Sequence, residues 1–443
     1  MRPSNAETSV ANVQMRVTGR RLPGRAPRIR AAVYVVAASV VLTLLRIPPA
    51  LADDTASGAL PSPVVLGPVV MLADWTFVDV STYHDGRVHL VGGKYAPPSR
   101  FMYLAHMTVD GDGGVSEDPI ASVPLVQYGL AAEFEASGVL HVTVDHNHYR
   151  RLETGWDGPT QGPACTQMIL AAEKLLCTDR ISAKEAGGKA DLAKLLLSQQ
   201  VGASWAPWRV VDRDDSTIIG GYHLVADGAR GVHLLYAALG KIAGSAKPRA
   251  VGDSRVRYVR LPRETLAPPL PEFRPDNAPV IVPPLGGEEG VSRAEVPVLT
   301  EGVALAVDPE SGLVLAASTY HQASKERYPL TYTIRDGVAD APSSVGDFAG
   351  DTSARIRLAP AGNDRFHVVI AYASGKRAQL GHLVYYLRSG NGWSRAVDLA
   401  DSTSEIVAIS TSLEVAADKG DAFVTWVDDK DKKARGRWVH VAN

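Results

Sequence analysis

One pattern recurs along this sequence: a hydrophobic strand, a tight turn, a second strand, a polar loop and a further strand with aromatic residues. Each copy holds three or four short strands, and its turns contain Gly, Asn or Asp, which accept the positive φ of tight hairpins. The clear copies cover residues 78–109, 131–156, 222–261, 302–337, 354–393 and 411–442, with a degenerate copy between 163 and 212. A repeat of this length predicts an array of like units that bury their faces against one another.

Four-stranded antiparallel sheets repeated around an axis form a β-propeller. The repeats therefore predict an all-β fold with six or seven blades of four antiparallel strands. The last strand, "GRWVHVAN" (436–443), ends within a repeat. We expect it to pair with early strands and close the ring, which removes free sheet edges. A pair of separate β-sandwiches is the structural alternative.

Two segments depart from the repeat. The segment 188–200 places Leu192, Leu195 and Leu196 at helical spacing, which predicts a short amphipathic helix on the degenerate blade. The segment 261–290 carries eight prolines and cannot form regular sheet. We interpret it as an extended connector between blades, with a hinge between two domains as the alternative.

The N-terminus has the features of an export signal. Arginines are frequent between residues 16 and 30, an apolar stretch of 15 residues follows at 31–45, and Ala50-Leu51-Ala52 forms an A-x-A cleavage site. We therefore expect a signal peptide at 1–52, a linker at 53–74, the propeller at 75–443 and a secreted or periplasmic location. A retained membrane anchor is the alternative; once the signal is removed, no membrane span is expected.

The chain has two cysteines, Cys165 and Cys177. In an exported protein they predict a local disulfide, with a pair of buried free thiols as the alternative. No Cys-x-x-Cys pattern supports a thiolate metal site.

The charge balance and the missing motifs exclude several function classes. The formal net charge is −2, so nothing global attracts nucleic acid. The sequence also lacks a Gly-x-Ser-x-Gly elbow, a phosphate-binding glycine loop and a His-Glu-x-x-His motif. We expect no metal, no cofactor, no nucleic-acid partner and a monomer.

Two blades carry a family resemblance. "VAADKGDAFVTW" (415–426) with "ARGRWVHV" (434–441), and "LAPAGNDRFHVVIAY" (358–372) with "GHLVYYLRSGNGWS" (381–394), resemble blades of the sialidase-like, or BNR-repeat, propeller superfamily. The Asp-box of that superfamily, Ser-x-Asp-x-Gly-x-x-Trp, is absent, and its arginine triad cannot be assigned. The resemblance is architectural and covers most of 75–443; its relatives include polysaccharide lyases, glycan-binding lectins and scaffolds.

In a propeller the loops between second and third strands (B–C loops) meet on one face. We predict these loops at 92–100, 145–151, 238–244, 318–328, 372–379 and 427–433. Arginine pairs bidentately with carboxylates and sulfates, and aromatic rings stack on sugars, so this rim suits an acidic glycan. Ordinary solvated loops are the alternative. The predicted ligand-binding residues are Lys94, Tyr95, Arg100, Asp145, Arg151, Arg327, Tyr328, Lys376 and Arg377.

The densest of these segments is "DHNHYRR" (145–151). His146 or His148 as base, Tyr149 as acid and Arg150 as carboxylate neutraliser would suit β-elimination from a uronic-acid polysaccharide. The residue types resemble those used by propeller-type polysaccharide lyases. A metal site on Asp145 and the two histidines, or a hydrogen-bonded loop without catalytic function, are the alternatives.

A second candidate lies in "STYHQASKERY" (318–328), where Tyr320 and His321 follow their strand as Asp145 and His146 follow theirs. We expect these two segments to face each other across the axis.

Three carboxylates are expected near connections between blades, where they could act as the catalytic acid, base or nucleophile of glycoside hydrolysis. They are Glu133, Glu135 and Asp351.

The sequence thus predicts an exported propeller that recognises a carbohydrate, an acidic polysaccharide or sialoside, on its B–C face and cleaves it by hydrolysis or elimination. The alternative is a non-catalytic scaffold that binds a protein or cell-surface partner.

Overall fold

A computed structural model describes the chain between residues 64 and 441. The chain divides into the units Met1–Asp54 and Thr55–Asn443, and every described residue lies in the second. The predicted signal peptide is therefore outside the described residues. The described ranges are 64–95, 101–124, 129–182, 193–201, 204–206, 209–210, 218–228, 231–239, 255–263, 296–297, 303–321, 327–341, 343–346, 352–374, 380–390, 392–400, 413–428 and 431–441.

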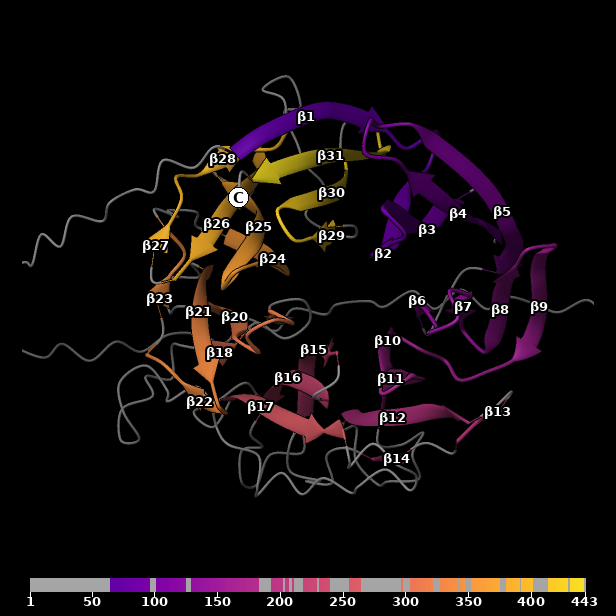
Figure 1. Ribbon diagram of the computed structural model, residues 1–443, viewed down its shortest axis with the longest axis horizontal. Coiled ribbons are helices and arrows are strands. Elements are labelled where there is room, and N and C mark those ends of the chain that lie inside the picture. Colours follow the sequence, from indigo (N-terminus) through magenta and orange to yellow (C-terminus); the bar gives the residue numbers. More distant parts are fainter. Residues whose placement is uncertain are drawn as a thin grey trace, which may run out of the picture. The chain divides into compact units, whose positions relative to one another are not determined.

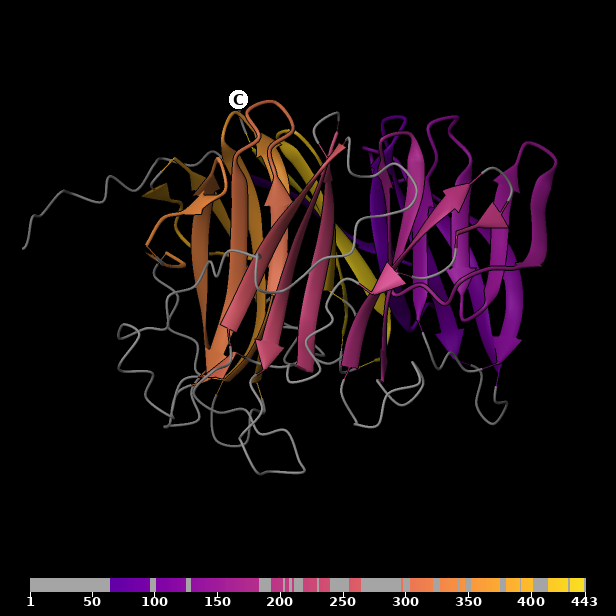
Figure 2. The same ribbon diagram turned by 90° about the horizontal axis from the view of Figure 1, so that it is seen from below.

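Seven antiparallel sheets form the blades of a propeller (Figures 1 and 2). Within a blade, letters A to D name the strands from the axis outward. Blade 1 consists of β2 (Phe77–His84), β3 (Arg87–Tyr95), β4 (Phe101–Val109) and β5 (Val115–Pro124). Blade 2 consists of β6 (Leu130–Phe134), β7 (Leu140–Val144), β8 (Asn147–Leu152) and β9 (Gly155–Gln161).

The next two blades lie in the middle of the chain. Blade 3 consists of β10 (Gln167–Ala171), β11 (Lys174–Ser182) and β12 (Ala193–Val201), with β13 (Ser204–Trp205) and β14 (Arg209–Val210) both pairing with β12. Blade 4 has three strands in the described part of the chain: β15 (Ile218–Asp227), β16 (Gly231–Leu239) and β17 (Arg255–Pro262).

The last three blades complete the ring. Blade 5 consists of β19 (Val303–Val307), β20 (Val314–His321), β21 (Arg327–Arg335), β22 (Val338–Ala339) and β23 (Ser343–Ser344), with β18 (Val296–Pro297) pairing with β20. Blade 6 consists of β24 (Thr352–Gly362), β25 (Arg365–Ser374), β26 (Leu380–Ser389), β27 (Gly392–Trp393) and β28 (Val397–Asp398). Blade 7 consists of β29 (Leu413–Asp418), β30 (Asp421–Val427), β31 (Ala434–Val441) and β1 (Val64–Met71).

The two ends of the propeller meet in blade 7. Strand β1 pairs antiparallel with β31, from Val64 opposite Val441 to Met71 opposite Arg435. The innermost strands β2, β6, β10, β15, β19, β24 and β29 contact one another in this order, and β29 contacts β2. The predicted closure of the ring is therefore confirmed, the blade number is seven, and the β-sandwich alternative is wrong. The predicted linker 53–74 is also wrong in part, because β1 lies inside it.

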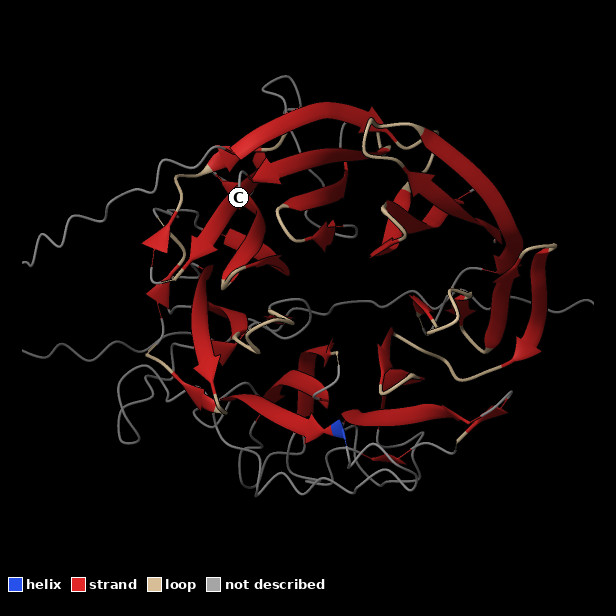
Figure 3. Cartoon of the chain, viewed as in Figure 1, coloured by secondary structure: helices blue, strands red, loops and turns tan. Residues whose placement is uncertain are grey.

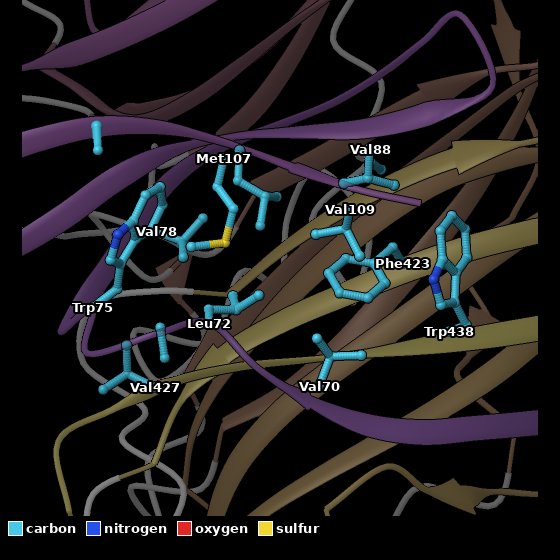
Figure 4. Close-up of a cluster of buried hydrophobic side chains, with 14 residues drawn as sticks. Val70, Leu72, Trp75, Val78, Val88, Met107, Val109, Phe423, Val427 and Trp438 are labelled. Atoms are coloured by element: carbon cyan, nitrogen blue, oxygen red, sulfur yellow. The ribbon is translucent and has the colours of Figure 1, made fainter. Parts of the chain in front are cut away.

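Each blade is buried on both faces, which explains its long apolar strands. Along β25, Phe366 and Val368 pack with residues of blade 5, whereas Val369 and Ala371 pack with residues of blade 7. Seven such clusters fill the seven contacts between neighbouring blades. Figure 4 shows the cluster between blades 7 and 1, in which Phe423 and Trp438 face Val88 and Val109.

The contact between blades 2 and 3 has the smallest described cluster, with five buried residues. Two of them are Cys165 and Cys177, which form a disulfide with a Cα–Cα distance of 5.5 Å. The predicted disulfide is therefore present. It joins the connection before β10 to strand β11, at the blade contact that buries the fewest apolar side chains in the described part of the chain.

The predicted helix at 188–200 is wrong, because residues Ala193–Val201 form strand β12. Leu195 pairs with Arg180 and Leu196 with Asp179 across the sheet, so this segment has the register of a strand. A short apolar run fits either period, and pairing with β11 decides between them. Apart from a short 3₁₀ turn at Arg263, no helix occurs among the described residues (Figure 3).

The proline-rich segment 261–290 is described only as far as Arg263, so its role as a connector lies outside the described residues. Where the structure describes the chain, it contains no helix long and apolar enough to cross a membrane.

Candidate functional site

The run Asp145–Arg151 is mostly strand and not the predicted loop. Strand β7 ends at Val144 and β8 begins at Asn147, so only Asp145 and His146 form the B–C turn. Asp145 adopts a φ of 51°, as tight hairpin turns require. Val144 and Asn147 form a cross-strand pair, which fixes this register. A two-residue turn thus replaces the seven-residue loop.

His148 lies inside blade 2 and faces blade 3. Its Nε2 atom is 2.9 Å from Nδ1 of His141, whose Nε2 atom is 3.0 Å from Oε2 of Glu135. The ring of Trp205 meets the His148 ring edge-on at a centroid distance of 6.0 Å. Burial lowers the pKa of His148 to about 4, and the neighbouring His141 lowers it further. Tyr149 is also buried, in the apolar cluster between blades 1 and 2.

Arg150 and Arg151 lie toward the opposite end of blade 2 from the B–C turn. They pair across the sheet with His141 and Leu140, at the start of β7. Arg150 forms an ion pair with Asp157, and Arg151 forms one with Asp118. The structure therefore does not bring these arginines to the B–C rim.

Blade 1 and blade 5 do present predicted residues at their B–C ends. Lys94 and Tyr95 end β3; the Lys94 ammonium lies 2.7 Å from Oδ2 of Asp74, and Tyr95 is 47% exposed. In blade 5 two cross-strand pairs end the sheet, Tyr320 with Tyr328 and His321 with Arg327. Arg100, Asp351, Lys376 and Arg377 lie outside the described residues.

Glu135 was predicted to lie near a connection between blades, and the structure places it elsewhere. It begins the A–B turn of blade 2, where its backbone N–H donates to the carbonyl of Val139 at 2.9 Å. Glu133 precedes it on β6, and burial raises the pKa of Glu133 to about 7.

Four charged residues gather on the innermost strands of blades 1, 6 and 7. They are Asp79 on β2, Arg355 and Arg357 on β24, and Glu414 on β29, and we call them the axial charge cluster. Nε and Nη2 of Arg357 donate to Oε1 of Glu414 at 3.3 and 3.2 Å. Both side chains of this ion pair are 23% exposed, so water still reaches it.

Asp79 is the titrating member of the axial charge cluster. The residue is exposed to solvent, yet surrounding protein removes much of the water that would hydrate its carboxylate. This burial, together with the charge of Glu414, raises the pKa of Asp79 to about 6, while the charges of Arg355 and Arg357 oppose the shift. A carboxyl group with a pKa near neutrality exchanges protons readily at physiological pH.

The field of the cluster reaches two further side chains. Burial raises the pKa of Tyr95, and the charge of Asp79 adds to the shift. His223 on β15 accepts a hydrogen bond from the N–H of Leu305 at 2.8 Å. Burial lowers the pKa of His223 to about 4, and the charge of Arg357 lowers it further.

Sequence reasoning missed the axial charge cluster because it searched loops for functional residues. The available signal was charge inside innermost strands: Asp79 in "FVDVS", Arg355 and Arg357 in "SARIRLAP", and Glu414 in "SLEVAA". Apart from Glu133 on β6, charges inside strand A are rare in the other blades, and a charge there costs free energy of desolvation. A comparison of the first strand of every repeat, in search of charged residues among apolar ones, would have found the cluster.

Among the described residues, no group of three or more His, Cys, Asp or Glu side chains is arranged to hold a metal ion. The cluster instead combines two guanidinium groups with two carboxylates. Guanidinium groups pair with anions and carboxyl groups exchange protons; here Arg357 is paired with Glu414, and Arg355 is buried.

The sequence matches no protein-family model and no curated protein. Its fold is similar to that of solved polysaccharide lyases. The lyase Uly1 has a TM-score of 0.56 and 10% identity over 83% of this chain and 90% of that chain. An ulvan lyase from a new lyase family has a TM-score of 0.53 and 10% identity over 82% of this chain and 94% of that chain. At these identities the likeness shows the fold alone: this chain is a β-propeller, as those enzymes are.

Proposed function

We propose that this protein is an exported propeller that binds an acidic polysaccharide at the B–C end of its blades, above the axial charge cluster, and cleaves it there. The cluster is the observation that supports the proposal most strongly. It combines the partly exposed ion pair of Arg357 and Glu414 with Asp79, whose pKa is raised to about 6 against the opposing charges of Arg355 and Arg357. Ligand carboxylates or sulfates are the anions that such arginines attract.

The surroundings of the cluster suit a sugar. Tyr95 at the end of β3 has about half of its surface exposed, and its ring packs on Phe77 at a centroid distance of 5.0 Å. A supported and exposed aromatic ring stacks on the apolar face of a sugar. Lys94 lies next to Tyr95 and adds a cation, which Asp74 holds in place.

The similar structures favour the same class of ligand. One ulvan lyase structure, with a TM-score of 0.51 and 10% identity over 84% of this chain and 93% of that chain, is bound to a segment of -[GlcA(1-4)Rha3S]-. That ligand carries the carboxylate and sulfate groups that the cluster would attract. The likeness in fold alone does not carry the specificity over, so the proposal depends on the charges of this chain.

A binding and turnover screen tests the proposal. The purified chain is mixed with uronic-acid polysaccharides, sulfated polysaccharides and sialosides, and binding is read by calorimetry. New reducing ends report any cleavage, and ultraviolet absorbance reports unsaturated uronates. We expect at least one uronic-acid polymer to bind and to be cleaved. Absence of binding and turnover across the panel would overturn the glycan function and leave the scaffold alternative.

A pair of arginine variants locates the site. Arg357→Gln removes a charge of the cluster, and we expect binding of the acidic polymer to weaken at least about tenfold. Arg335→Gln is the matched control, because Arg335 is an exposed arginine at the other end of blade 5. Equal affinity of the two variants would place the ligand elsewhere.

A further inference from the structure

We infer that the B–C end of blade 1 is a subsite for a neutral sugar unit of the bound polysaccharide, where Tyr95 and Phe101 stack on sugar rings and the Lys94–Asp74 ion pair binds hydroxyl groups. This inference rests on the proposed function and adds a second kind of sugar to it. The preferred polymer then carries neutral units beside its acidic ones.

Exposed aromatic rings gather at this end of blade 1. In the described part of the chain seven large hydrophobic side chains are exposed, and the aromatic ones among them are Tyr95 at 47% and Phe101 at 51%. Both flank the same B–C connection, because Tyr95 ends β3 and Phe101 begins β4. An exposed aromatic ring gains free energy when a ligand with an apolar face covers it, and sugar rings have such faces.

The two rings stand on opposite faces of the blade. Tyr95 lies opposite Met102 in the sheet, and Met102 packs toward blade 2. Phe101 precedes Met102 by one residue and therefore points to the other face, as Lys94 does. A glycan that passes over the end of blade 1 can thus cover one ring with one unit and the other ring with a neighbouring unit.

Lys94 and Asp74 provide polar groups on the face that carries Phe101. The Lys94 ammonium lies 2.7 Å from Oδ2 of Asp74, and the two side chains are 39% and 59% exposed. The ammonium is also 5.4 Å from the ring centroid of Tyr103. Because the carboxylate offsets the ammonium charge, the pair attracts an anion only weakly. It offers charged donors and acceptors to the hydroxyl groups of a sugar.

The charges around this pair are balanced as well. The charge of Lys433 lowers the pKa of Asp74, after the larger effect of Lys94, and the charge of Glu117 adds to the raised pKa of Lys94. Two cations thus stand with two carboxylates at this end of the blade. Such a balance suits a neutral unit, whereas a carboxylate or sulfate is better served by unbalanced cations.

The turn that carries Asp74 is fixed by the protein itself. Trp75 is fully buried and packs flat on Gly92, where an added Cβ atom would lie 2.9 Å from the indole ring. The hydroxyl oxygen of Thr76 accepts a hydrogen bond from the N–H of Tyr95 at 3.2 Å. Asp74 and Tyr95 therefore share one rigid support, and a ligand that binds both has little ordering cost to meet.

Removal of the two rings tests the subsite on the full chain. The probe is the uronic-acid polymer that the wild type binds in the screen, and the affinity is read by calorimetry. The double variant Tyr95→Ala with Phe101→Ala should raise Kd at least about tenfold. Tyr95→Phe with Phe101→Tyr keeps both rings and should stay within about threefold of the wild type. An alanine double variant that also stays within threefold would overturn the subsite.

A matched control separates stacking from a general loss of apolar surface. Val338→Ala trims a side chain that is 70% exposed on blade 5. We expect it to leave Kd unchanged. A loss of affinity equal to that of the alanine double variant would show that the polymer does not depend on the rings of blade 1.

Asp74→Asn decides between a neutral and an acidic sugar at this place. A neutral unit loses a charged acceptor, so binding should weaken at least about threefold. An acidic unit would instead meet a Lys94 ammonium without its counter-charge and bind more tightly. Unchanged or tighter binding would overturn the neutral subsite. Asp112→Asn is the matched control, since it removes the same charge from an exposed turn at the opposite end of blade 1.

Failure of this inference and failure of the proposed function give different results. A wild type that binds none of the polymers overturns both. Binding that depends on Arg357 and is unaffected by the variants of blade 1 overturns the subsite alone.

Discussion

Nδ1 of His141 lies 2.9 Å from Nε2 of His148 inside blade 2. A neutral imidazole has one N–H donor and one acceptor, so two neutral rings share one hydrogen bond, whereas two protonated rings offer only donors. Blade 1 contains the same pair, with Nδ1 of His89 at 3.0 Å from Nε2 of His106. Protonation of both rings therefore breaks the contact and places two cations side by side.

In blades 4 and 6 a tyrosine hydroxyl takes the place of the second imidazole. His233 contacts the hydroxyl of Tyr258, and Nδ1 of His367 lies 2.9 Å from the hydroxyl of Tyr385. In all four blades the histidine stands on strand B and its partner on strand C, two residues before the histidine's cross-strand neighbour. These four contacts are the cross-strand histidine pairs.

We predict that the propeller loses stability in mild acid through these pairs. Burial lowers the pKa of His148 and of His367 to about 4, whereas the unfolded chain titrates near 6.5. Stability is then complete above pH 6.5 and is lost as pH falls from there to about 4, because only the unfolded chain binds protons in that window. Each such histidine removes up to about 3 kcal/mol. Urea unfolding at several pH values across this window measures the loss.

A pair of histidine variants checks the source of this acid sensitivity. His148→Gln removes a buried titrating ring, so its stability should depend less on pH than that of the wild type. His146→Gln replaces an exposed histidine in the neighbouring turn and should keep the pH dependence. Identical slopes for His148→Gln and the wild type would contradict the prediction.

Asp79→Asn should stabilise the protein at neutral pH. The pKa of Asp79 is raised from 3.8 to about 6, so its ionisation destabilises the fold, and this cost grows as pH rises from about 4 through 6. At pH 7.5 we expect a higher melting temperature for the variant than for the wild type. Below about pH 4 both side chains are neutral and the difference should vanish. A lower melting temperature of the variant at neutral pH would show that the carboxylate holds the fold together.

Gly436→Ala should destabilise blade 7. A Cβ atom at Gly436 would lie 2.2 Å from Cζ of Phe423, which is fully buried against blade 1 (Figure 4). Overpacking of this kind costs about 1–3 kcal/mol. Gly111→Ala is the control, since nothing lies within 4 Å of its added Cβ. The double variant Gly436→Ala with Phe423→Leu should recover part of the loss in chemical denaturation.

Removal of the disulfide should weaken the contact between blades 2 and 3. The bond joins residues 12 positions apart, and it lies where the described apolar cluster is smallest. We expect replacement of Cys165 and Cys177 by alanine to lower the free energy of unfolding by about 2–4 kcal/mol. Reductant should lower the free energy of unfolding of the wild type to that of the variant, and it should leave the free energy of unfolding of the variant unchanged. An effect of reductant on the variant would point to another cause.

The fold was predictable because turns and strands repeat at regular intervals. Asp85-Gly86 and Asn363-Asp364 adopt positive φ at A–B turns, where the sequence predicts hairpins. The last strand was correctly expected to pair with an early one. The strand at Ala193–Val201 was missed because leucines at positions 192, 195 and 196 fit a helical face until their pairing with β11 is known.

The site was less predictable, for a physical reason. The polar run Asp145–Arg151 looks like a loop unless the length of the turn is known. Because the turn has only two residues, His148 and Tyr149 lie in strand β8 and are buried inside the blade. Single charges in apolar strands, such as Asp79 and Arg357, look unfavourable in sequence. These residues come from three different blades and lie far apart in the sequence. Their common position on innermost strands is visible only in the folded propeller.

The pairing of β1 with β31 sets an order of events for the nascent chain. Strand β1 is synthesised before blades 1 to 6, and its partner β31 is synthesised after them. Until then the growing protein is an open arc of blades with an apolar face at each end. Closure therefore cannot begin before blades 1 to 6 and strand β31 have been made, and synthesis that stops before β31 leaves a protein that has most of its blades but no ring.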